Sequence, residues 1–252
     1  MTGDLTKRTE PGSGSESRPD GASESSQIQL SVIVPMLNEA DALPGLLSHL
    51  TRIHAQTSAT LEVLLIDGGS TDDSVLVAKA AGFRVIHSER GRARQMNTGA
   101  NHARGEHLLF LHADTRLPDR AIEPVLQALA RGGWGRFDVT ITGSARMLRV
   151  VALMMNLRSR FSGIATGDQT LFMRRSWFDQ VGQFPDQPLM EDIELSKRLR
   201  HRQRPQCLRA TVSTSGRRWV EYGIWRTIFL MWRLRWAYWR GVPAEQLAKR
   251  YR

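Results

Sequence analysis

The sequence predicts an α/β fold, Rossmann-like in outline, in which helices cover both faces of a mostly parallel β-sheet. From residue 30 onward, short apolar runs rich in β-branched residues alternate with segments whose apolar residues recur at helical spacing. Strands and helices that alternate in this way produce parallel sheets buried on both sides. Polar clusters follow several of the apolar runs, and in such sheets ligands bind beyond the carboxyl ends of the strands.

The first three expected elements have clear local signals. A β-branched run over 30–35 is closed by a proline and predicts the first strand. Leucine and isoleucine then recur at helical spacing over 43–53, which predicts an amphipathic helix. The apolar run 61–66 predicts a second strand, which ends at the turn Asp67-Gly68-Gly69-Ser70.

The next elements continue the alternation. A helix is expected over 72–81, where Gly82 stops it, and a third strand over 83–87. A second helical stretch covers 92–103, and 107–111 is a fourth apolar run.

The second half of the chain is less regular. Helices are expected over 118–131 and 145–158, and a strand over 170–174. A helix over 191–200 opens with acidic residues, which suit the positive end of a helix dipole. No internal repeat is found.

Composition divides the 252 residues into three parts. Residues 1–27 are rich in Ser, Gly and Glu with few large apolar groups, which predicts a disordered leader. The α/β domain is expected over 28–205, followed by a basic, tryptophan-rich helical extension over 206–252. Of the net charge of +10, residues 198–252 contribute fourteen basic and two acidic residues. This asymmetry predicts an anionic partner for the end of the chain.

Several classes of protein are excluded or disfavoured by simple counts. The single cysteine, Cys207, cannot form an intrachain disulfide, which favours a reducing compartment. There is no run of eighteen uncharged apolar residues and no apolar signal core near the N-terminus, so a cytoplasmic protein is expected. Walker P-loop, Gly-x-Ser-x-Gly and His-Glu-x-x-His motifs do not occur, and the scattered histidines do not support a zinc cluster.

Three acidic sites stand out: Asp67, Asp114 and the pair Glu191-Asp192. Each follows an apolar stretch or a turn, so all three are candidates for one cleft. An uncompensated carboxylate at the end of a buried strand is costly, and a hard divalent cation bound together with a diphosphate removes that cost. The alternative is that each of these acids caps a helix or forms a turn.

Four motifs occur in a fixed order over residues 30–200: Ser31-Val32-Ile33-Val34-Pro35 with Asn38-Glu39, the segment from Leu65 to Asp72, the segment from Leu109 to Asp114, and Glu191-Asp192. In this order they resemble the motifs of family 2 glycosyltransferases, which have the GT-A fold. Three further segments are similar to a bacterial subgroup, the radical-SAM/selenodomain-associated transferases: Gly91–Asn97, Gly167–Gln169 and Ser215–Trp219.

The resemblance implies a nucleotide-diphosphate sugar, a UDP-sugar, as donor. The nucleotide-binding positions that it implies are Pro35, Asn38, Glu39, Asp67, Gly68 and Arg94. Arg92 and Arg94 are candidates for holding phosphates, or are ordinary exposed helix residues.

The resemblance also implies a divalent metal, Mn²⁺ or Mg²⁺, bound by Asp114. The first acid of the family's metal motif is replaced by His112 in this sequence. His112 is therefore a further metal ligand, a sugar contact or a packed side chain.

The chemistry implied by the resemblance is inverting glycosyl transfer to a hydroxyl acceptor. Asp192 takes the position of the general base, and Glu191 beside it either tunes that base by like-charge repulsion or caps the helix. Gly167, Asp168 and Gln169 are expected to contact the sugar or the acceptor, or to form a polar turn before a strand. The alternative function is a nucleotide-sugar-binding or scaffold protein without turnover, which the replacement by His112 keeps open.

The end of the chain carries an aromatic stripe. Trp225, Phe229, Trp232, Trp236 and Trp239 follow spacings of 4, 3, 4 and 3, and arginines run beside them at spacings of seven. Such a helix over 219–240 is typical of an anionic membrane surface, here the inner face of the plasma membrane. The equal alternative is that the stripe packs on the domain or in a homodimer. Nucleic acid is disfavoured, because no recognised nucleic-acid-binding motif is present.

Overall fold

The computed structural model describes residues 1–3 and 27–251, apart from the side chain of residue 218. The disordered leader that we predict for 1–27 falls mainly on residues 4–26, which lie outside the described residues.

The described strands form one eight-stranded sheet, confirming the predicted α/β class. Four of its seven neighbouring pairs are parallel, namely β1 with β2, β1 with β4, β2 with β3, and β6 with β8. The order across the sheet is β3 (Arg84–His87), β2 (Leu61–Asp67), β1 (Leu30–Met36), β4 (His107–Phe110), β7 (Leu171–Arg174), β6 (Trp134–Thr142), β8 (Gln206–Ser215) and β5 (Thr115–Arg116).

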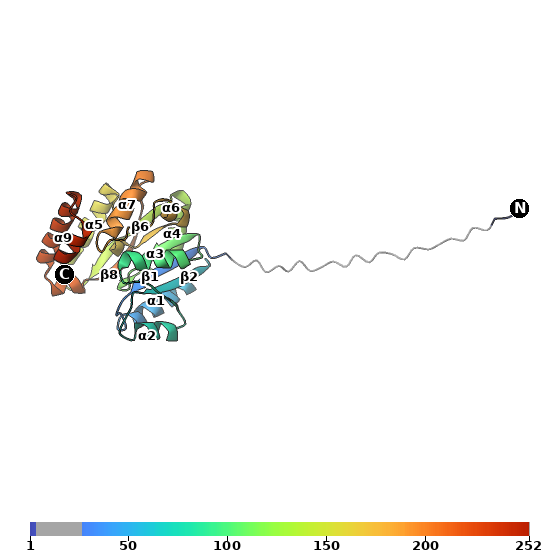
Figure 1. Ribbon diagram of the computed structural model, residues 1–252, viewed down its shortest axis with the longest axis horizontal. Coiled ribbons are helices and arrows are strands. Elements are labelled where there is room, and N and C mark those ends of the chain that lie inside the picture. Colours follow the sequence, from blue (N-terminus) through green and yellow to red (C-terminus); the bar gives the residue numbers. More distant parts are fainter. Residues whose placement is uncertain (4–26, 252) are drawn as a thin grey trace.

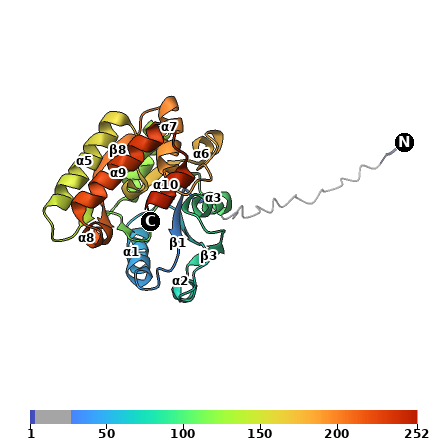
Figure 2. The same ribbon diagram turned by 60° about the vertical axis from the view of Figure 1, so that its left-hand side comes forward.

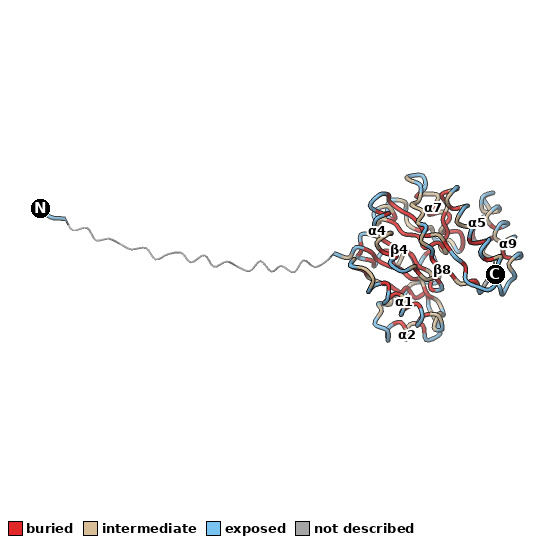
Figure 3. The backbone as a smooth tube through the Cα atoms, turned by 180° about the vertical axis from the view of Figure 1, so that it is seen from behind, coloured by how far each residue is buried: buried red, intermediate tan, exposed pale blue. Residues whose placement is uncertain are grey.

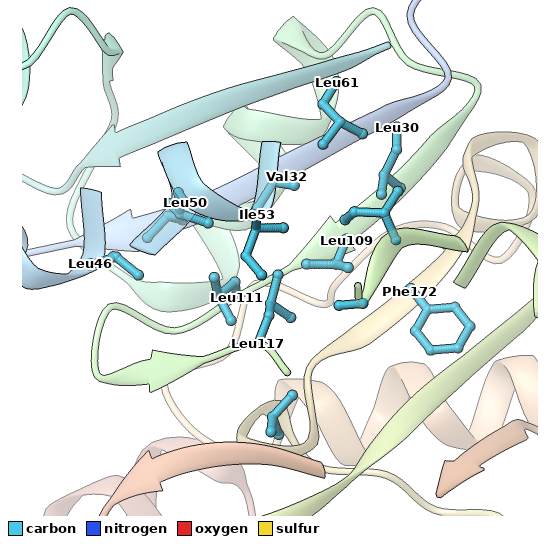
Figure 4. Packing of buried hydrophobic residues seen from close by; sticks show 14 of the residues in the cluster. Leu30, Val32, Leu46, Leu50, Ile53, Leu61, Leu109, Leu111, Leu117 and Phe172 are labelled. Atoms are coloured by element: carbon cyan, nitrogen blue, oxygen red, sulfur yellow. The ribbon is translucent and has the colours of Figure 1, made fainter. Parts of the chain in front are cut away.

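Helices lie on both faces of this sheet (Figure 1). Strand residues alternate between the two cores: Val32 and Val34 of β1 join one, and Ile33 joins the other. The first core includes α1 (Leu43–Ala55), α2 (Ser74–Ala80) and α4 (Ile122–Arg131), and Figure 4 shows part of its packing. The second includes α3 (Arg92–His102), α6 (Arg175–Gln180) and α7 (Glu191–Arg202).

Two long strands were not expected from the sequence. Strand β6 contains Arg136 and Asp138, charged residues that interrupt an apolar strand pattern. Arg136 is nonetheless completely buried, because it pairs with Asp138 and donates a hydrogen bond to Ser159 Oγ at 3.1 Å. The partners that permit this burial come partly from α5 (Met147–Ser162), outside the strand itself.

The expected helical extension over 206–252 is only partly helical. Its first ten residues form β8, which pairs with β6 inside the sheet, because Val212 belongs to the first core and Leu208 and Ala210 pack against it. Helices begin after it as α8 (Arg217–Glu221), α9 (Ile224–Trp239) and α10 (Ala244–Tyr251).

Helices α9 and α10 pack against the segment before α7. Leu234 and Leu247 form a buried cluster with Leu189, Met190 and Ile193. The aromatic stripe of α9 points the other way and is exposed, so the alternative in which the stripe packs on the domain is wrong. Among the described helices, none is both long enough and apolar enough to cross a bilayer.

A glycine sets how closely α3 approaches the sheet. A Cβ at Gly99 would overlap Ile33 Cγ2 and lie 3.0 Å from Ile66 Cγ1. The close approach lets Gln95 Nε2 donate hydrogen bonds to the carbonyls of Met36 and Ile66, at 2.9 and 2.8 Å, at the ends of β1 and β2. Gly99 thereby holds the first turn of α3 at the carboxyl edge of the sheet.

Gly99→Ala is expected to destabilise the protein by about 1–3 kcal/mol, because the added methyl overpacks the core. Gly45→Ala is the matched control, since Gly45 lies in α1 with only Arg116 Nη2 nearby, at 3.5 Å from an added Cβ. The control is expected to be neutral or stabilised by up to about 1 kcal/mol. Urea unfolding measures both, and a Gly99→Ala protein as stable as the wild type would contradict this account.

Candidate active site

A cavity of about 550 Å³ lies at the carboxyl ends of β1 and β4, beside the first turns of α3 and α7. Eight of the thirteen predicted site residues line it: Pro35, Glu39, His112, Asp114, Gly167, Asp168, Glu191 and Asp192. Asp114 and Asp192, which lie far apart in the sequence, thus share one cavity.

Asp192 is held in place at the start of α7. The residue two before it, Met190, adopts a left-handed conformation with φ 66°, which turns the chain into the helix. Asp192 Oδ2 accepts a hydrogen bond from the Gly167 amide at 2.8 Å, and Oδ1 accepts one from the Ile193 amide at 2.7 Å. Each oxygen keeps a second lone pair. The carboxylate is therefore oriented by the backbone and still able to accept a proton.

Glu191 links α7 to α3. Its side chain is 3% exposed, and Oε1 lies 3.5 Å from Arg92 Nη1. Burial raises the pKa of Glu191, the charge of Asp192 raises it further, and Arg92 opposes both. Burial disfavours the charge on Arg92, but Glu191, Asp168 and Asp192 outweigh it and raise the pKa of the guanidinium. Arg92 therefore stands among three carboxylates at the cavity.

Asp168 and His112 form a second pair. His112 Nδ1 lies 3.6 Å from Asp168 Oδ1, and the imidazole is 12% exposed. Burial in the cavity opposes the charge of Asp168, but the hydrogen bond and charge of His112, with Arg92 and Arg158, lower its pKa. His112 Nε2 is buried against Gly167, where an added Cβ would meet the ring, and has no hydrogen-bond partner among the described residues. This packing favours a supporting role for His112 beside Asp168.

Asp114 and Glu39 lie on the sheet side of the cavity. Burial raises the pKa of Glu39, and the charge of Asp114 is the next largest cause. Asp114 is exposed, and its carboxylate accepts a hydrogen bond from Thr115 Oγ1 at 3.3 Å. A carboxyl group whose ionisation is opposed by a neighbouring carboxylate marks a suitable place for a cation.

The residues present fit a metal that takes few ligands from the protein. Among the described residues, no three His, Cys, Asp or Glu side chains converge to hold an ion by themselves. Mg²⁺ and Mn²⁺ accept hard oxygen ligands and commonly bind through one or two carboxylates together with substrate phosphates. The exposed carboxylate of Asp114, in a cavity with room for a diphosphate, meets that requirement.

Two predicted nucleotide contacts, Asp67 and Gly68, lie in the turn after β2 and do not line the cavity. Asp67 is 2% exposed and accepts hydrogen bonds from the amides of Gly69 and Ser70, at 3.2 and 3.0 Å. Burial opposes its charge, but bonds from Ser70, Gly69 and His87 outweigh it and lower the pKa of Asp67. A side chain at Gly68 would overlap the amide of Gln95, which does line the cavity. Both residues shape the edge of the site.

Three other predicted residues also lie outside the cavity. Asn38, at φ 53°, accepts a hydrogen bond from the Thr71 amide at 2.8 Å and joins two loops. Arg94 is 46% exposed and pairs with Glu89 and Asp186 at 2.6 and 2.8 Å. Gln169 is fully buried, where it caps the short helix η1 (Gly167–Gln169), so it does not reach substrate in this structure.

Part of the cavity wall comes from residues that the sequence did not identify. Thr227, Met231 and Arg235 of α9 line it at spacings of four, on the face opposite the aromatic stripe. Arg235 Nε is buried without a hydrogen-bond partner among the described residues. The four-residue spacing places these three side chains on one face of the helix, but only the packing shows that this face meets the cavity. Arg90, in the loop before α3, was missed for the same reason.

Comparison with known proteins identifies the family. Glycosyl transferase family 2 matches residues 31–182, which is more than half of the chain. An undecaprenyl-phosphate 4-deoxy-4-formamido-L-arabinose transferase of Klebsiella pneumoniae is 32% identical over 162 residues, covering 58% of this chain and 48% of that protein. A PGL/p-HBAD biosynthesis glycosyltransferase of Mycobacterium bovis is 40% identical over 94 residues, 34% of this chain and 36% of its own. The chain spans about half, or less, of the length of these relatives.

Solved structures share the fold at lower sequence identity. S. aureus TarS in complex with UDP-GlcNAc has a TM-score of 0.60 and 19% identity, covering 74% of this chain and 58% of TarS. A mannosyltransferase of Pyrobaculum calidifontis in complex with GDP-Man and Mn²⁺ has a TM-score of 0.54 and 21% identity, covering 75% and 57%. These likenesses confirm the GT-A fold. With the family match over residues 31–182, this chain belongs to glycosyltransferase family 2.

Proposed function

We propose that this protein transfers a sugar from a nucleotide-diphosphate sugar to a hydroxyl acceptor, with inversion at the anomeric carbon. The observation that carries the proposal is the cavity shared by Asp114 and Asp192, whose lining also includes Arg92, Glu191 and Asp168. A candidate base and a candidate diphosphate site thus face one space large enough for a substrate.

The donor is assigned to the edge of the sheet. Pro35 near the end of β1 and Glu39 after that strand line the cavity, and Arg90 and Arg92 line it before and at the start of α3. The first turn of a helix and neighbouring guanidinium groups both favour phosphate. TarS and a glucosyl-3-phosphoglycerate synthase of Mycobacterium tuberculosis were crystallised with UDP-GlcNAc or UDP, which supports a UDP-sugar here.

Asp114, supported by Glu39, would hold Mn²⁺ or Mg²⁺ together with the diphosphate. When bound, the ion neutralises negative charge on the departing diphosphate. The crystallised neighbours that hold Mn²⁺ support this cofactor in general.

Asp192 acts as the general base in this proposal. The acceptor oxygen forms a bond to the anomeric carbon as the bond to the diphosphate oxygen breaks, and Asp192 takes the proton of the acceptor hydroxyl. Attack from the face opposite the leaving group inverts the configuration. The two backbone amides that hold Asp192 prevent the carboxylate from turning away from the acceptor.

The acceptor is assigned to the side of the cavity formed by α7 and α9. Substitution of one arginine on each side tests this division, because both arginines line the cavity and we assign Arg90 to the donor side and Arg235 to the acceptor side. Arg90→Gln is expected to weaken UDP binding in the presence of Mn²⁺ about tenfold, since a hydrogen bond to a charged group contributes ~1.5–3 kcal/mol. Arg235→Gln is expected to change it less than about twofold. Isothermal calorimetry measures both, and equal losses would contradict the division.

The competing function is a nucleotide-sugar-binding protein without turnover, which the presence of His112 in place of an acid keeps open. A panel of nucleotide sugars, screened by thermal shift with Mn²⁺, identifies the donor, because a ligand that binds the folded state raises the melting temperature. Release of nucleotide from that donor, with and without a candidate acceptor, then separates the two functions. Binding without any release of nucleotide would support the competing function.

A further inference from the structure

The outer faces of α5 and α9 expose an unusual amount of apolar surface. Twelve of the fourteen large hydrophobic side chains that are exposed among the described residues belong to α5, α8, α9 or the turn after α8. Monomeric soluble proteins rarely gather exposed apolar groups in one region unless that region binds something. We call these residues the α5–α9 face: Val150, Leu153, Met154, Leu157, Phe161, Val220, Tyr222, Trp225, Phe229, Trp232, Trp236 and Trp239.

The two helices lie side by side at one edge of the molecule (Figures 1 and 2). Their inner sides are joined in one cluster, in which Val151 and Ala152 of α5 pack with Ile224 and Ile228 of α9. Figure 3 shows the same two helices at the edge from behind, with exposed segments on both. Because α5 and α9 are neighbours, their exposed apolar side chains lie on the same part of the protein surface.

The aromatic side chains of this face lie outside the buried cores of the molecule. The opposite side of α9 already buries Leu234 in the cluster with Met190 and Ile193. The stripe residues Trp225, Phe229, Trp232, Trp236 and Trp239 are between 58% and 75% exposed. Five large aromatic groups held in water at this exposure indicate a binding role.

The charge around the face is mostly positive, with Glu221 of α8 as an exposed acid beside Val220 and Tyr222. Neither α5 nor α9 contains an acidic residue, and exposed arginines stand along both: Arg146, Arg149, Arg226, Arg233 and Arg240. The guanidinium of Arg240 lies 5.3 Å from the centre of the Trp236 ring. In a twofold dimer through this face, a mostly basic patch would face the same basic patch, because each copy contributes the same surface. An anionic lipid surface complements both the charge and the aromatic side chains.

We propose that the α5–α9 face docks the protein on an anionic lipid bilayer. The aromatic and aliphatic side chains enter the boundary between headgroups and acyl chains, and the arginines contact the phosphates of the headgroups. The other side of α9 carries Met231 and Arg235 to the cavity, so docking brings the cavity within about one helix diameter, ~10–12 Å, of the lipid. This inference does not depend on the proposed chemistry.

Co-sedimentation of the full chain with vesicles tests the proposal. The protein is expected to bind phosphatidylcholine vesicles that contain phosphatidylglycerol at low salt, with much weaker binding to pure phosphatidylcholine or at high salt. The double variant Trp232→Gln/Trp236→Gln is expected to lower the partition coefficient more than about tenfold. Met154→Gln/Phe161→Gln is expected to lower it as well, because α5 is part of the face. Arg226→Gln and Arg233→Gln are each expected to lower it roughly fivefold.

Leu76→Gln is the matched control, since Leu76 of α2 is 67% exposed and lies outside the α5–α9 face. It is expected to bind vesicles as the wild type does. Circular dichroism melting verifies that each variant is folded. Absence of binding to anionic vesicles at low salt would overturn the proposal. So would a dimer in analytical ultracentrifugation that the tryptophan variants abolish while vesicle binding persists unchanged.

Discussion

Asp192→Asn is expected to reduce nucleotide release and sugar transfer by about 10²–10⁴-fold, the usual contribution of a general base. Asparagine has nearly the same shape and can still accept the hydrogen bond from the Gly167 amide through its carbonyl oxygen. It cannot take a proton from an acceptor hydroxyl. Donor binding should persist, because the donor is assigned to the opposite side of the cavity.

The release of nucleotide from the donor that the thermal-shift panel identifies is measured by chromatography. The shift that the donor produces in the melting temperature is recorded for the same variant. Asp179→Asn serves as a matched control, because Asp179 lies outside the cavity in α6. Turnover of Asp192→Asn near the wild-type rate would show that Asp192 is not the general base.

Asp114→Ala is expected to lower activity by about 10²–10³-fold and to abolish the Mn²⁺-dependent part of the thermal shift with UDP. The carboxylate is exposed and lies close to Glu39. Among the described residues, no group of three His, Cys, Asp or Glu side chains could hold the metal in its place. Losing a Lewis acid that stabilises the leaving diphosphate costs several kcal/mol, or about 10²–10³-fold in rate.

Chelation by EDTA tests the same assignment without a mutation. The wild-type enzyme should lose activity in EDTA and regain it when Mn²⁺ or Mg²⁺ is added in excess. Asp119→Asn is the control for the substitution, since Asp119 is an exposed carboxylate outside the cavity. Full turnover in EDTA would show that the transfer needs no metal. A wild-type response to metal in Asp114→Ala would show that another residue is the metal ligand.

The sequence predicted most elements of the first half of the fold. The boundaries of β1, β2, α1 and α3 agree with expectation to within two residues, because strand runs, turn glycines and helical periodicity are local signals. Strand β6 was missed, since its Arg136 resembles a surface residue until Asp138 and Ser159 are brought to it.

The candidate site was predictable to a similar extent. The acids at Glu39, Asp114 and Asp192 could be chosen from motifs at strand and helix ends, and the structure brings all three to one cavity. Gln169 could not be distinguished from a substrate contact, because its burial depends on the packing of η1. Arg235 could not be found at all, since nothing in the local sequence of α9 indicates which segment its inner face meets.

The sequence by itself determined the order of strands and helices in the first half, the identity of the acidic residues, the excess of arginine after residue 198 and the spacing of the aromatic side chains. Only the tertiary structure decided that the stripe of α9 faces outward, that α5 adds to the same apolar surface, and that α9 closes the cavity. The physical reason is that periodicity shows which residues share a face of a helix. Whether water, lipid or protein covers that face depends on segments distant in the chain.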